Sequence, residues 1–170
     1  MSVAAVVLAA GEASRFGTPK QRLLLPEVLE RLEQSPVDEI VVVAGAHTLE
    51  TPARVVTCTS WKRGPGASLA SGLAELGDDV EAAIVVLADG PDLAPEAVAR
   101  VIASWRAENG TIVAASYGGE RGHPLLVARE AWGAIPDEGL RQLDARLVPC
   151  DDLGAPGDVN TPDDLPERLR

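Results

Sequence analysis

The sequence predicts an α/β fold, a three-layer α/β/α sandwich built on a mostly parallel, Rossmann-like sheet. Three observations predict it: short runs rich in Val and Ile recur along the chain, several are apolar without alternation, and amphipathic helical patterns lie between them. Continuous apolar strands are typical of a parallel sheet that is covered on both faces. Strands that alternate with helices imply right-handed crossovers and helices in two outer layers.

The expected strands and helices follow in chain order. The apolar runs predict strands over residues 3–9, 39–44, 54–57, 82–87 and 111–115. A helix is expected over 95–107, because four apolar residues recur there on one helical face: Val98, Val101, Ile102 and Trp105. A similar stripe follows Gly66, at Leu69, Leu73 and Leu76.

Length and composition favour one domain that spans residues 1–170. A chain of 170 residues with 46% hydrophobic content is long enough for one full core. It has neither a signal-peptide pattern nor an apolar run long enough to span a bilayer, so we expect a cytoplasmic protein with no membrane partner. Cys58 and Cys150 are too few and too far apart for a disulfide framework or a zinc site, and we expect free thiols in the core.

The charge distribution favours a small anion as ligand. The net charge of −11 argues against binding to nucleic acid, because phosphate backbones are bound mainly by Lys and Arg. The first 25 residues differ from the rest, since they hold Arg15, Lys20 and Arg22 against Glu12 alone. A basic loop within an acidic chain suits a small anion better than a polymer.

The basic loop follows the first predicted strand, in the stretch VAAVVLAAGEASRFGTPK. In open α/β sheets, ligands bind beyond the carboxyl ends of the strands. A glycine there lets the backbone approach an anion, and N–H groups with cationic side chains can cradle phosphates. The spacing matches neither GxxxxGK[ST] nor GxGxxG. From these residues alone, phosphate binding and a turn that is merely capped by Arg15 both stay open.

Six motifs carry a resemblance to a known family. LAAGEASRFGTPK resembles the LAAGxSxRxGxxK signature of the MobA-like nucleotidyltransferases, most closely the molybdenum-cofactor cytidylyltransferases. Five further motifs are similar to the family's in the same order along the chain: SWKRGPGASLASGL, LADGPDL, RGHPLLV, DEGLR and DVNTPDDL. Their order across nearly the whole chain makes the resemblance specific.

The resemblance implies a sheet of the nucleotide-diphospho-sugar transferase type and a group-transfer reaction. A nucleoside monophosphate passes from a nucleoside triphosphate to a phosphate-bearing acceptor, pyrophosphate is released, and Mg²⁺ is required. In the nearest branch the acceptor is the molybdopterin-type cofactor and a molybdoenzyme receives the product. LAAG in place of LAGG favours CTP over GTP.

The resemblance also implies roles for individual residues. Arg15 and Lys20 would hold the triphosphate and stabilise charge on the leaving pyrophosphate, and Asp89 would ligate Mg²⁺. A solvated loop pair and an Asp-Gly-Pro turn are the structural alternatives. Further nucleotide contacts fall on the signature loop and on the second motif: Leu8, Ala9, Ala10, Gly11, Ser14, Gly64 and Ser68.

The later motifs imply a second metal ligand and an acceptor site. Asn160 or Asp158 would supply the second oxygen ligand, although Thr161 and the residues after it also read as a helix cap. Arg121, Gly122 and His123 would line the acceptor side. Two further residues of that region, Asp137 and Arg141, would shape the acceptor pocket or merely begin a helix. Asp92 is expected to initiate the helix at Pro95.

The chain departs from the family after Lys20. It reads QRLLLPEVLERL where relatives carry a Gly-Lys-Pro loop beside the nucleotide and acceptor sites. Two alternatives to cytidylyl transfer therefore stay open. One is guanylyl or other nucleotidyl transfer to a different small phosphate acceptor, and the other is a non-catalytic maturation protein that binds a nucleotide or a cofactor.

Overall fold

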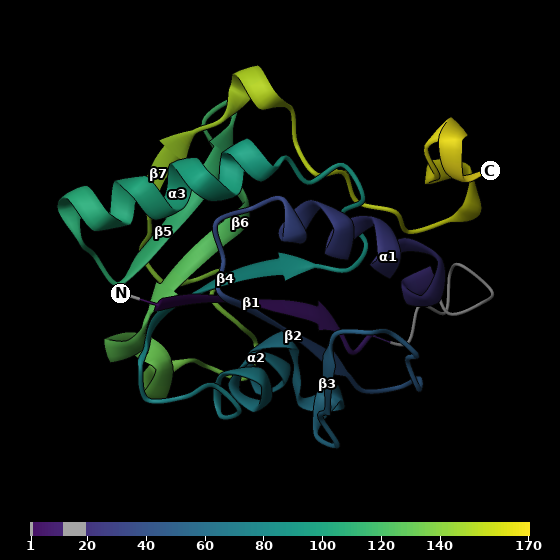
Figure 1. Ribbon diagram of the computed structural model, residues 1–170, viewed down its shortest axis with the longest axis horizontal. Helices are drawn as coiled ribbons and strands as arrows, with labels where there is room; N and C mark the ends of the chain where they lie inside the picture. Colours follow the sequence, from purple (N-terminus) through teal and green to yellow (C-terminus); the bar gives the residue numbers. More distant parts are fainter. Residues whose placement is uncertain (1, 12–19) are drawn as a thin grey trace.

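The computed structural model describes residues 2–11 and 20–170, with a seven-stranded sheet at its centre (Figure 1). The strand order is β3-β2-β1-β4-β6-β5-β7. The strands are β1 (Ser2–Ala9), β2 (Glu39–Ala44), β3 (Arg54–Thr57), β4 (Val80–Leu87), β5 (Ile112–Tyr117), β6 (Glu120–Ala128) and β7 (Arg146–Pro149). The α-helices are α1 (Lys20–Glu33), α2 (Pro65–Leu73) and α3 (Pro95–Glu108), and five short 3₁₀ helices complete the described elements.

All strand pairs are parallel except those made by β6, which runs antiparallel to β4 and β5. The central pairs are in register, with Leu8 opposite Val43 on one side and opposite Leu87 on the other. The carboxyl ends of β1, β2 and β4 therefore meet at one edge of the sheet. The mostly parallel α/β fold expected from the sequence is confirmed.

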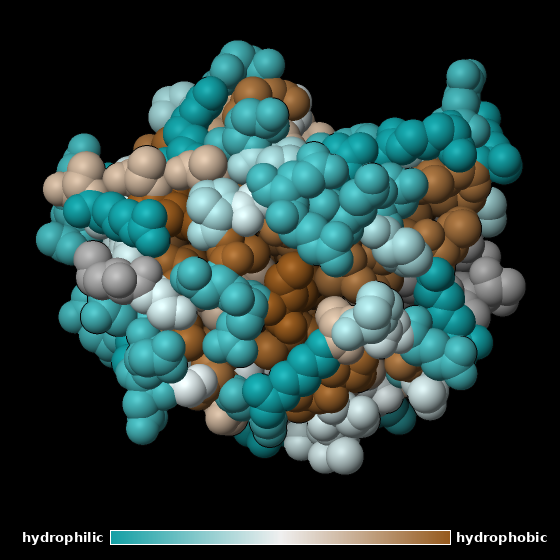
Figure 2. Space-filling model, viewed as in Figure 1, coloured by the Kyte–Doolittle hydropathy of each residue, from teal (hydrophilic) through white to brown (hydrophobic). Residues whose placement is uncertain are grey.

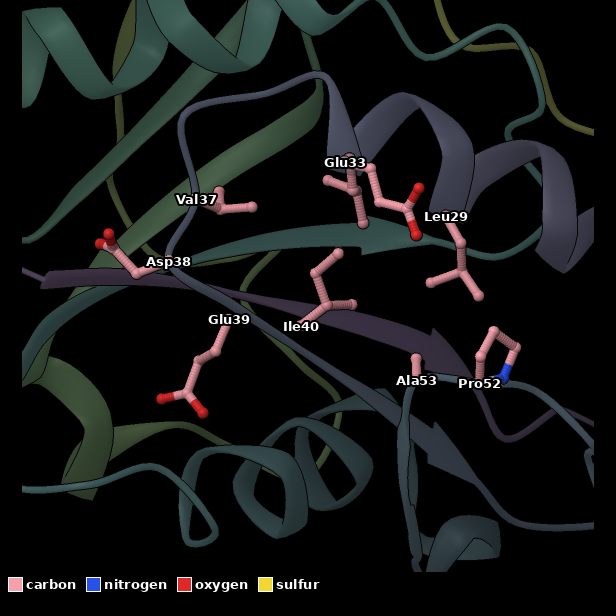
Figure 3. A pocket seen from close by; sticks show the side chains of 9 residues that line it. Leu29, Glu33, Val37, Asp38, Glu39, Ile40, Pro52 and Ala53 are labelled. Atoms are coloured by element: carbon pink, nitrogen blue, oxygen red, sulfur yellow. The ribbon is translucent and has the colours of Figure 1, made fainter.

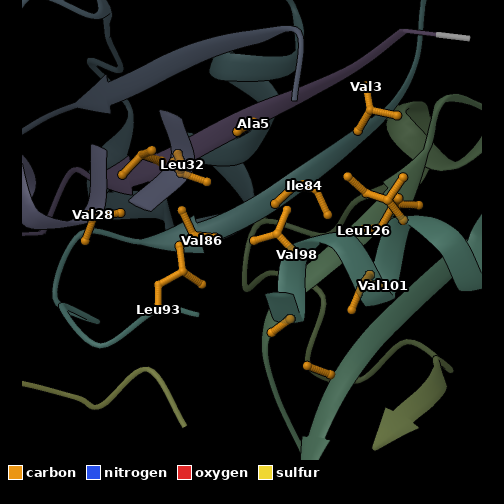
Figure 4. Close-up of a cluster of buried hydrophobic side chains, with 14 of the residues drawn as sticks. Val3, Ala5, Val28, Leu32, Ile84, Val86, Leu93, Val98, Val101 and Leu126 are labelled. Carbon is orange, nitrogen blue, oxygen red and sulfur yellow. The ribbon is translucent and has the colours of Figure 1, made fainter. Parts of the chain in front are cut away.

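Two buried clusters form the layers. Alternate residues of the strands face α1 and α3 on one side, where Val28, Leu32 and Val98 pack against Val3 and Ile84 (Figure 4). The other residues of the same strands face α2, where Leu69 and Leu73 pack. The central strands β1, β2 and β4 carry apolar runs without alternation because both of their faces are covered.

The helices agree with their predicted faces. Helix α3 begins at Pro95 as expected and buries Val98, Val101, Ile102 and Trp105. Helix α2 buries Leu69 and Leu73, and Leu76 joins the same cluster beyond the end of the helix. Both cysteines are buried and free, as expected, and burial raises the pKa of the Cys150 thiol.

The connection between β2 and β3 contains no helix among the described residues, although the two strands are parallel. Beside it lies a shallow cavity of about 350 Å³ at the amino ends of these strands (Figure 3). Leu29, Ile40 and Ala53 line it, with Glu33 at its side. Figure 2 shows apolar residues near the middle of this face, with hydrophilic residues around them. Across the described residues, no helix combines the length and the apolar character that crossing a membrane requires.

Candidate functional site

The carboxyl ends of β1 and β4 bring the signature loop and Asp89 together. The N–H of Ala88 donates to the carbonyl of Leu8 at 3.0 Å, so Asp89 follows directly beside Ala9 and Ala10. On the other side of β1, the N–H of Ala46 donates to the carbonyl of Ala10 at 3.2 Å. The predicted nucleotide loop and the predicted metal aspartate thus share one edge of the sheet.

Ala10, near the start of the signature loop, lies close to the segments that follow β2 and β3. A Cβ on Gly45 would lie 2.8 Å from the Cβ and the carbonyl oxygen of Ala10 and from the Cβ of Trp61. A glycine is needed there because any side chain would collide with the loop. Leu8 is partly exposed, Ala9 and Ala10 are buried, and Gly11 is exposed at the start of the loop.

The predicted cations fall only partly within the described residues. Ser14 and Arg15 lie outside them. Lys20 is the first residue of α1, which places its backbone at the end of the loop, but the described side chains of this helix begin at Arg22. Arg22 donates two hydrogen bonds to the carbonyl of Thr48, at 3.0 and 3.2 Å, which attaches the first turn of α1 to the β2–β3 connection.

The chain near the C-terminus meets the loop of Asp89. The carbonyl of Asp89 accepts the N–H of Val159 at 3.1 Å, so Asn160 stands next to the predicted metal site. A Cβ on Gly90 would lie 3.0 Å from Pro156, which shows how closely the two segments approach. Asp158 flanks Val159 on its other side and is exposed.

The oxygen ligands at this edge fit a magnesium ion. Asp89 follows a buried strand, and its Oδ1 atom is buried. Mg²⁺ takes one or two protein carboxylates and leaves the remaining positions to phosphates and water. Among residues 2–11 and 20–170 there is no cluster of three or more His, Cys, Asp or Glu side chains that could hold a metal. One carboxylate, Asp89, together with the amide of Asn160 is a donor set of the kind that Mg²⁺ takes when phosphates and water complete its coordination.

The cap expected after Asn160 is present. The carboxylate of Asp164 accepts the N–H of Thr161 at 2.9 Å and that of Asn160 at 3.0 Å, around the short 3₁₀ helix Pro162–Asp164. This cap fixes the backbone of Asn160, so a capping role for the motif and a ligand role for Asn160 are compatible.

The second predicted nucleotide segment packs against residues 136–139. Gly64 has a φ of 133°, a conformation that favours glycine. The N–H of Gly66 donates to the carbonyl of Asp137 at 2.8 Å, and the Asp137 carboxylate pairs with Arg63 at 2.7 Å. Asp137 lies in a turn, not at the start of a helix. Ser68 is buried inside α2, below the surface of this segment.

The predicted acceptor residues lie at the start of β6. Because β6 runs antiparallel to β4, its first residues come to the edge where β4 ends. The Arg121 guanidinium donates to the carbonyls of Leu140 and Leu143 at 2.7 and 2.6 Å, so it holds the 140–143 segment. Gly122 lies against the ring of Tyr117, whose hydroxyl donates to the carbonyl of His123 at 2.7 Å.

The charge state of this region follows from its burial. Burial, together with the nearby charge of Arg121, lowers the pKa of His123 to about 4. Its imidazole is therefore neutral at neutral pH and can form a hydrogen bond without neutralising a phosphate. Burial also lowers the pKa of Arg121 and raises the pKa of Tyr117 to about 12.

The prediction for Asp92 is wrong. Helix α3 has Ala94 as its N-cap, and the Asp92 carboxylate instead pairs with Arg168 at 2.8 Å. No local pattern predicts this contact, because the two residues are 76 positions apart and Arg168 lies outside the six motifs. Arg31, which donates to the carbonyl of Leu93 at 3.1 Å, was missed for the same reason.

The chain matches one protein family and several solved structures. The MobA-like NTP transferase domain matches residues 5–150. A probable molybdenum cofactor guanylyltransferase from Chloroflexus aggregans is 32% identical over 127 residues, 69% of this chain, and the chain spans 60% of that relative's length.

Two mycobacterial structures share the fold over nearly the whole chain. The Rv0371c homologue from Mycobacterium sp. strain JC1 is 28% identical with a TM-score of 0.79, over 98% of this chain and 94% of that one. The Mycobacterium tuberculosis protein Rv0371C, in complex with manganese, is 26% identical with a TM-score of 0.76, over 96% of both chains. The two structures share with this chain the mostly parallel α/β fold that was expected. By the match over residues 5–150, this chain belongs to the MobA-like NTP transferase family.

Proposed function

We propose that this protein transfers a nucleoside monophosphate from a nucleoside triphosphate to a phosphate-bearing acceptor of the molybdopterin type, with release of pyrophosphate. The observation that carries the proposal is the meeting of three motifs at one edge of the sheet. The hydrogen bonds from Ala88 to Leu8 and from Val159 to Asp89 join the signature loop, the aspartate loop and the segment of Asn160.

The reaction brings two polyanions together and expels a third, so the site has to neutralise charge and hold the reacting oxygens in line. Lys20, at the start of α1, and Arg15 are the cations for the triphosphate. The backbone of Leu8 to Gly11 would approach the base and ribose. Neutral His123 would orient the acceptor through a hydrogen bond, since its lowered pKa makes it a poor cation at neutral pH.

A divalent cation is part of the proposal. Asp89 and Asn160 would hold it, and when bound it supplies positive charge to the phosphate oxygens. The fit of this donor set to Mg²⁺ supports the assignment, as does the related Rv0371C structure, which is a complex with manganese.

Two nucleotides remain candidates, each with its own observation. LAAG in the signature favours CTP. The relative from Chloroflexus aggregans is named a guanylyltransferase, which favours GTP. The methyl group of Ala10 lies against Gly45 and only 7% of the residue is exposed, so this methyl offers little surface for reading a base.

The test is a pyrophosphate-release assay with the purified protein, molybdopterin-type acceptor and each of CTP, GTP, ATP and UTP, with Mg²⁺ and with EDTA. We expect release with CTP or GTP only when both acceptor and Mg²⁺ are present. Release without acceptor would instead indicate hydrolysis of the triphosphate. Tight binding of a triphosphate without any release would favour the non-catalytic maturation protein.

A further inference from the structure

The last residues of the chain, 156–170, form a segment that we call the C-terminal strap. It passes the end of β4 and reaches α1 (Figure 1). Two backbone hydrogen bonds attach the strap to the loop of Asp89: Val159 N–H to the Asp89 carbonyl at 3.1 Å, and Asp92 N–H to the Pro156 carbonyl at 2.8 Å. The loop that carries the candidate metal ligand is therefore held from outside the sheet.

The strap is anchored on α1 by apolar packing. Val159 and Leu165 form a small buried cluster with Leu24, the fifth residue of the helix, and Leu169 packs against it. Arg170 donates to the carbonyls of Leu165 and Asp163 at 3.0 and 2.9 Å, so it stabilises the strap itself. The strap thus connects the Asp89 loop to the half of α1 that begins at Lys20.

One guanidinium bridges the loop and the helix. Arg168 Nη2 donates to Asp92 Oδ1 at 2.8 Å and to the Pro91 carbonyl at 3.2 Å, while its Nε lies 3.7 Å from Glu27 Oε2 of α1. The planar guanidinium of an arginine donates hydrogen bonds to several acceptors in fixed directions, which the single ammonium group of a lysine cannot do. The Asp89 loop is therefore connected to α1 through polar contacts as well as through the apolar cluster.

We propose that Arg168 is a positioning residue, which sets the distance between the Asp89 loop and α1, the helix that begins at Lys20. This inference rests on the proposed function, in which Asp89 holds the cation and Lys20 holds the triphosphate. Arg168 and Asp92 are each more than 40% exposed, and such exposed pairs contribute little to the free energy of unfolding. The contribution of Arg168 is to hold the Asp89 loop and α1 at the correct spacing, because the metal and the phosphates align only at that spacing.

The test compares two arginines in the full chain. Arg168→Gln removes the bridge. Arg100→Gln is the matched control, since Arg100 makes a similarly short pair with Asp152, at 2.7 Å against 2.8 Å for Arg168 with Asp92, and this pair joins α3 to the segment after β7. We measure Mn²⁺ affinity by calorimetry with CTP or GTP present, and amide hydrogen exchange of residues 88–93 without ligand.

We expect Arg168→Gln to bind Mn²⁺ about tenfold more weakly and to exchange the Asp92 amide faster, with a melting temperature close to that of the wild type. Arg100→Gln is expected to change neither readout. Asp92→Asn removes the same pair from the other side and is expected to weaken Mn²⁺ binding similarly, which keeps the test decisive if Arg168→Gln folds poorly.

The two proposals fail in different ways. Wild-type protein that binds neither Mn²⁺ nor a triphosphate would overturn the proposed function, and the positioning role with it. Wild-type binding together with unchanged Mn²⁺ affinity in Asp92→Asn and in folded Arg168→Gln would overturn the positioning role alone.

Discussion

Asp89 is the residue on which the proposed chemistry depends most. Asp89→Asn keeps the size of the side chain but removes the negative charge that a hard cation prefers. We expect a fold and a melting temperature like those of the wild type, and Mg²⁺-dependent pyrophosphate release reduced by more than about 100-fold. The control is Asp78→Asn, which changes an exposed carboxylate at the opposite edge of the sheet. Full turnover in Asp89→Asn would remove the metal assignment.

His123 predicts a pH dependence of stability. Its folded pKa of about 4 lies below the ordinary histidine value of 6.5, so the unfolded chain binds more protons between these values. This contribution to the free energy of unfolding is fully present above about pH 6.5 and is lost as the pH falls toward 4. Within that window the loss approaches about 1.4 kcal/mol per pH unit.

The measurement is urea unfolding at pH 7, 6 and 5, where most carboxylates are still charged. His123→Gln is expected to flatten the decline between pH 6.5 and 5 relative to the wild type. The other histidine, His47, gives the matched control His47→Gln. An unchanged decline in His123→Gln would show that other groups cause it.

The sequence predicted the site residues unevenly, and the reason is physical. The place of Asp89 at the carboxyl edge could be predicted because it closely follows a mostly apolar strand. Its metal role comes from the resemblance and stays a prediction. The pair of Asp92 with Arg168 and the bonds from Arg121 to residues 140–143 depend on segments that meet only in the folded chain. Neither contact has a local pattern that reveals it.

At the scale of elements, the docking of α2 on residues 136–139 gives a stability prediction. A Cβ on Gly66 would lie 1.7 Å from the Pro136 carbonyl oxygen, a distance that requires the backbone to move. Gly66→Ala is therefore expected to lower the free energy of unfolding by about 1–3 kcal/mol. Gly133→Ala, where a Cβ meets no atom within 4 Å, is the control. Chemical denaturation of both variants measures the difference, and equal stability would contradict the close approach.

The elements that the sequence predicted and the elements that it missed differ in their surroundings. Strands β1 and β4 are apolar except for Ser2 and Glu81 near their amino ends, because both of their faces are covered, so they stand out in the sequence. Strand β6 begins with Glu120, Arg121 and His123 and contains Pro124, so it lacks that pattern. Strand β7 has only four residues at the edge of the sheet. Helix α1 was not predicted, and it contains Pro26, a residue that is unfavourable inside a helix.

At the scale of the whole molecule, the two edges of the sheet differ in kind. The carboxyl edge gathers the signature loop, Asp89, Asn160 and the start of β6. The amino edge holds the shallow cavity beside Ile40, with Glu33 at its side. In a chain of net charge −11, an anionic substrate is repelled by most of the surface, so the cations of the signature loop and a bound metal would direct it to the carboxyl edge.

This arrangement predicts how ligands stabilise the whole fold. A ligand at 100 times its Kd raises the free energy of unfolding by about 2.7 kcal/mol, because it binds only the folded chain. For a chain of this size we expect CTP or GTP with Mg²⁺ to raise the melting temperature by about 5–10 °C. With EDTA in place of Mg²⁺, or in Asp89→Asn, the increase is expected to be much smaller, since the triphosphate then lacks its cation. Suppose that all four triphosphates raised the melting temperature equally and that EDTA had no effect. The carboxyl edge of the sheet would then bind phosphate without the metal site and without selecting the base.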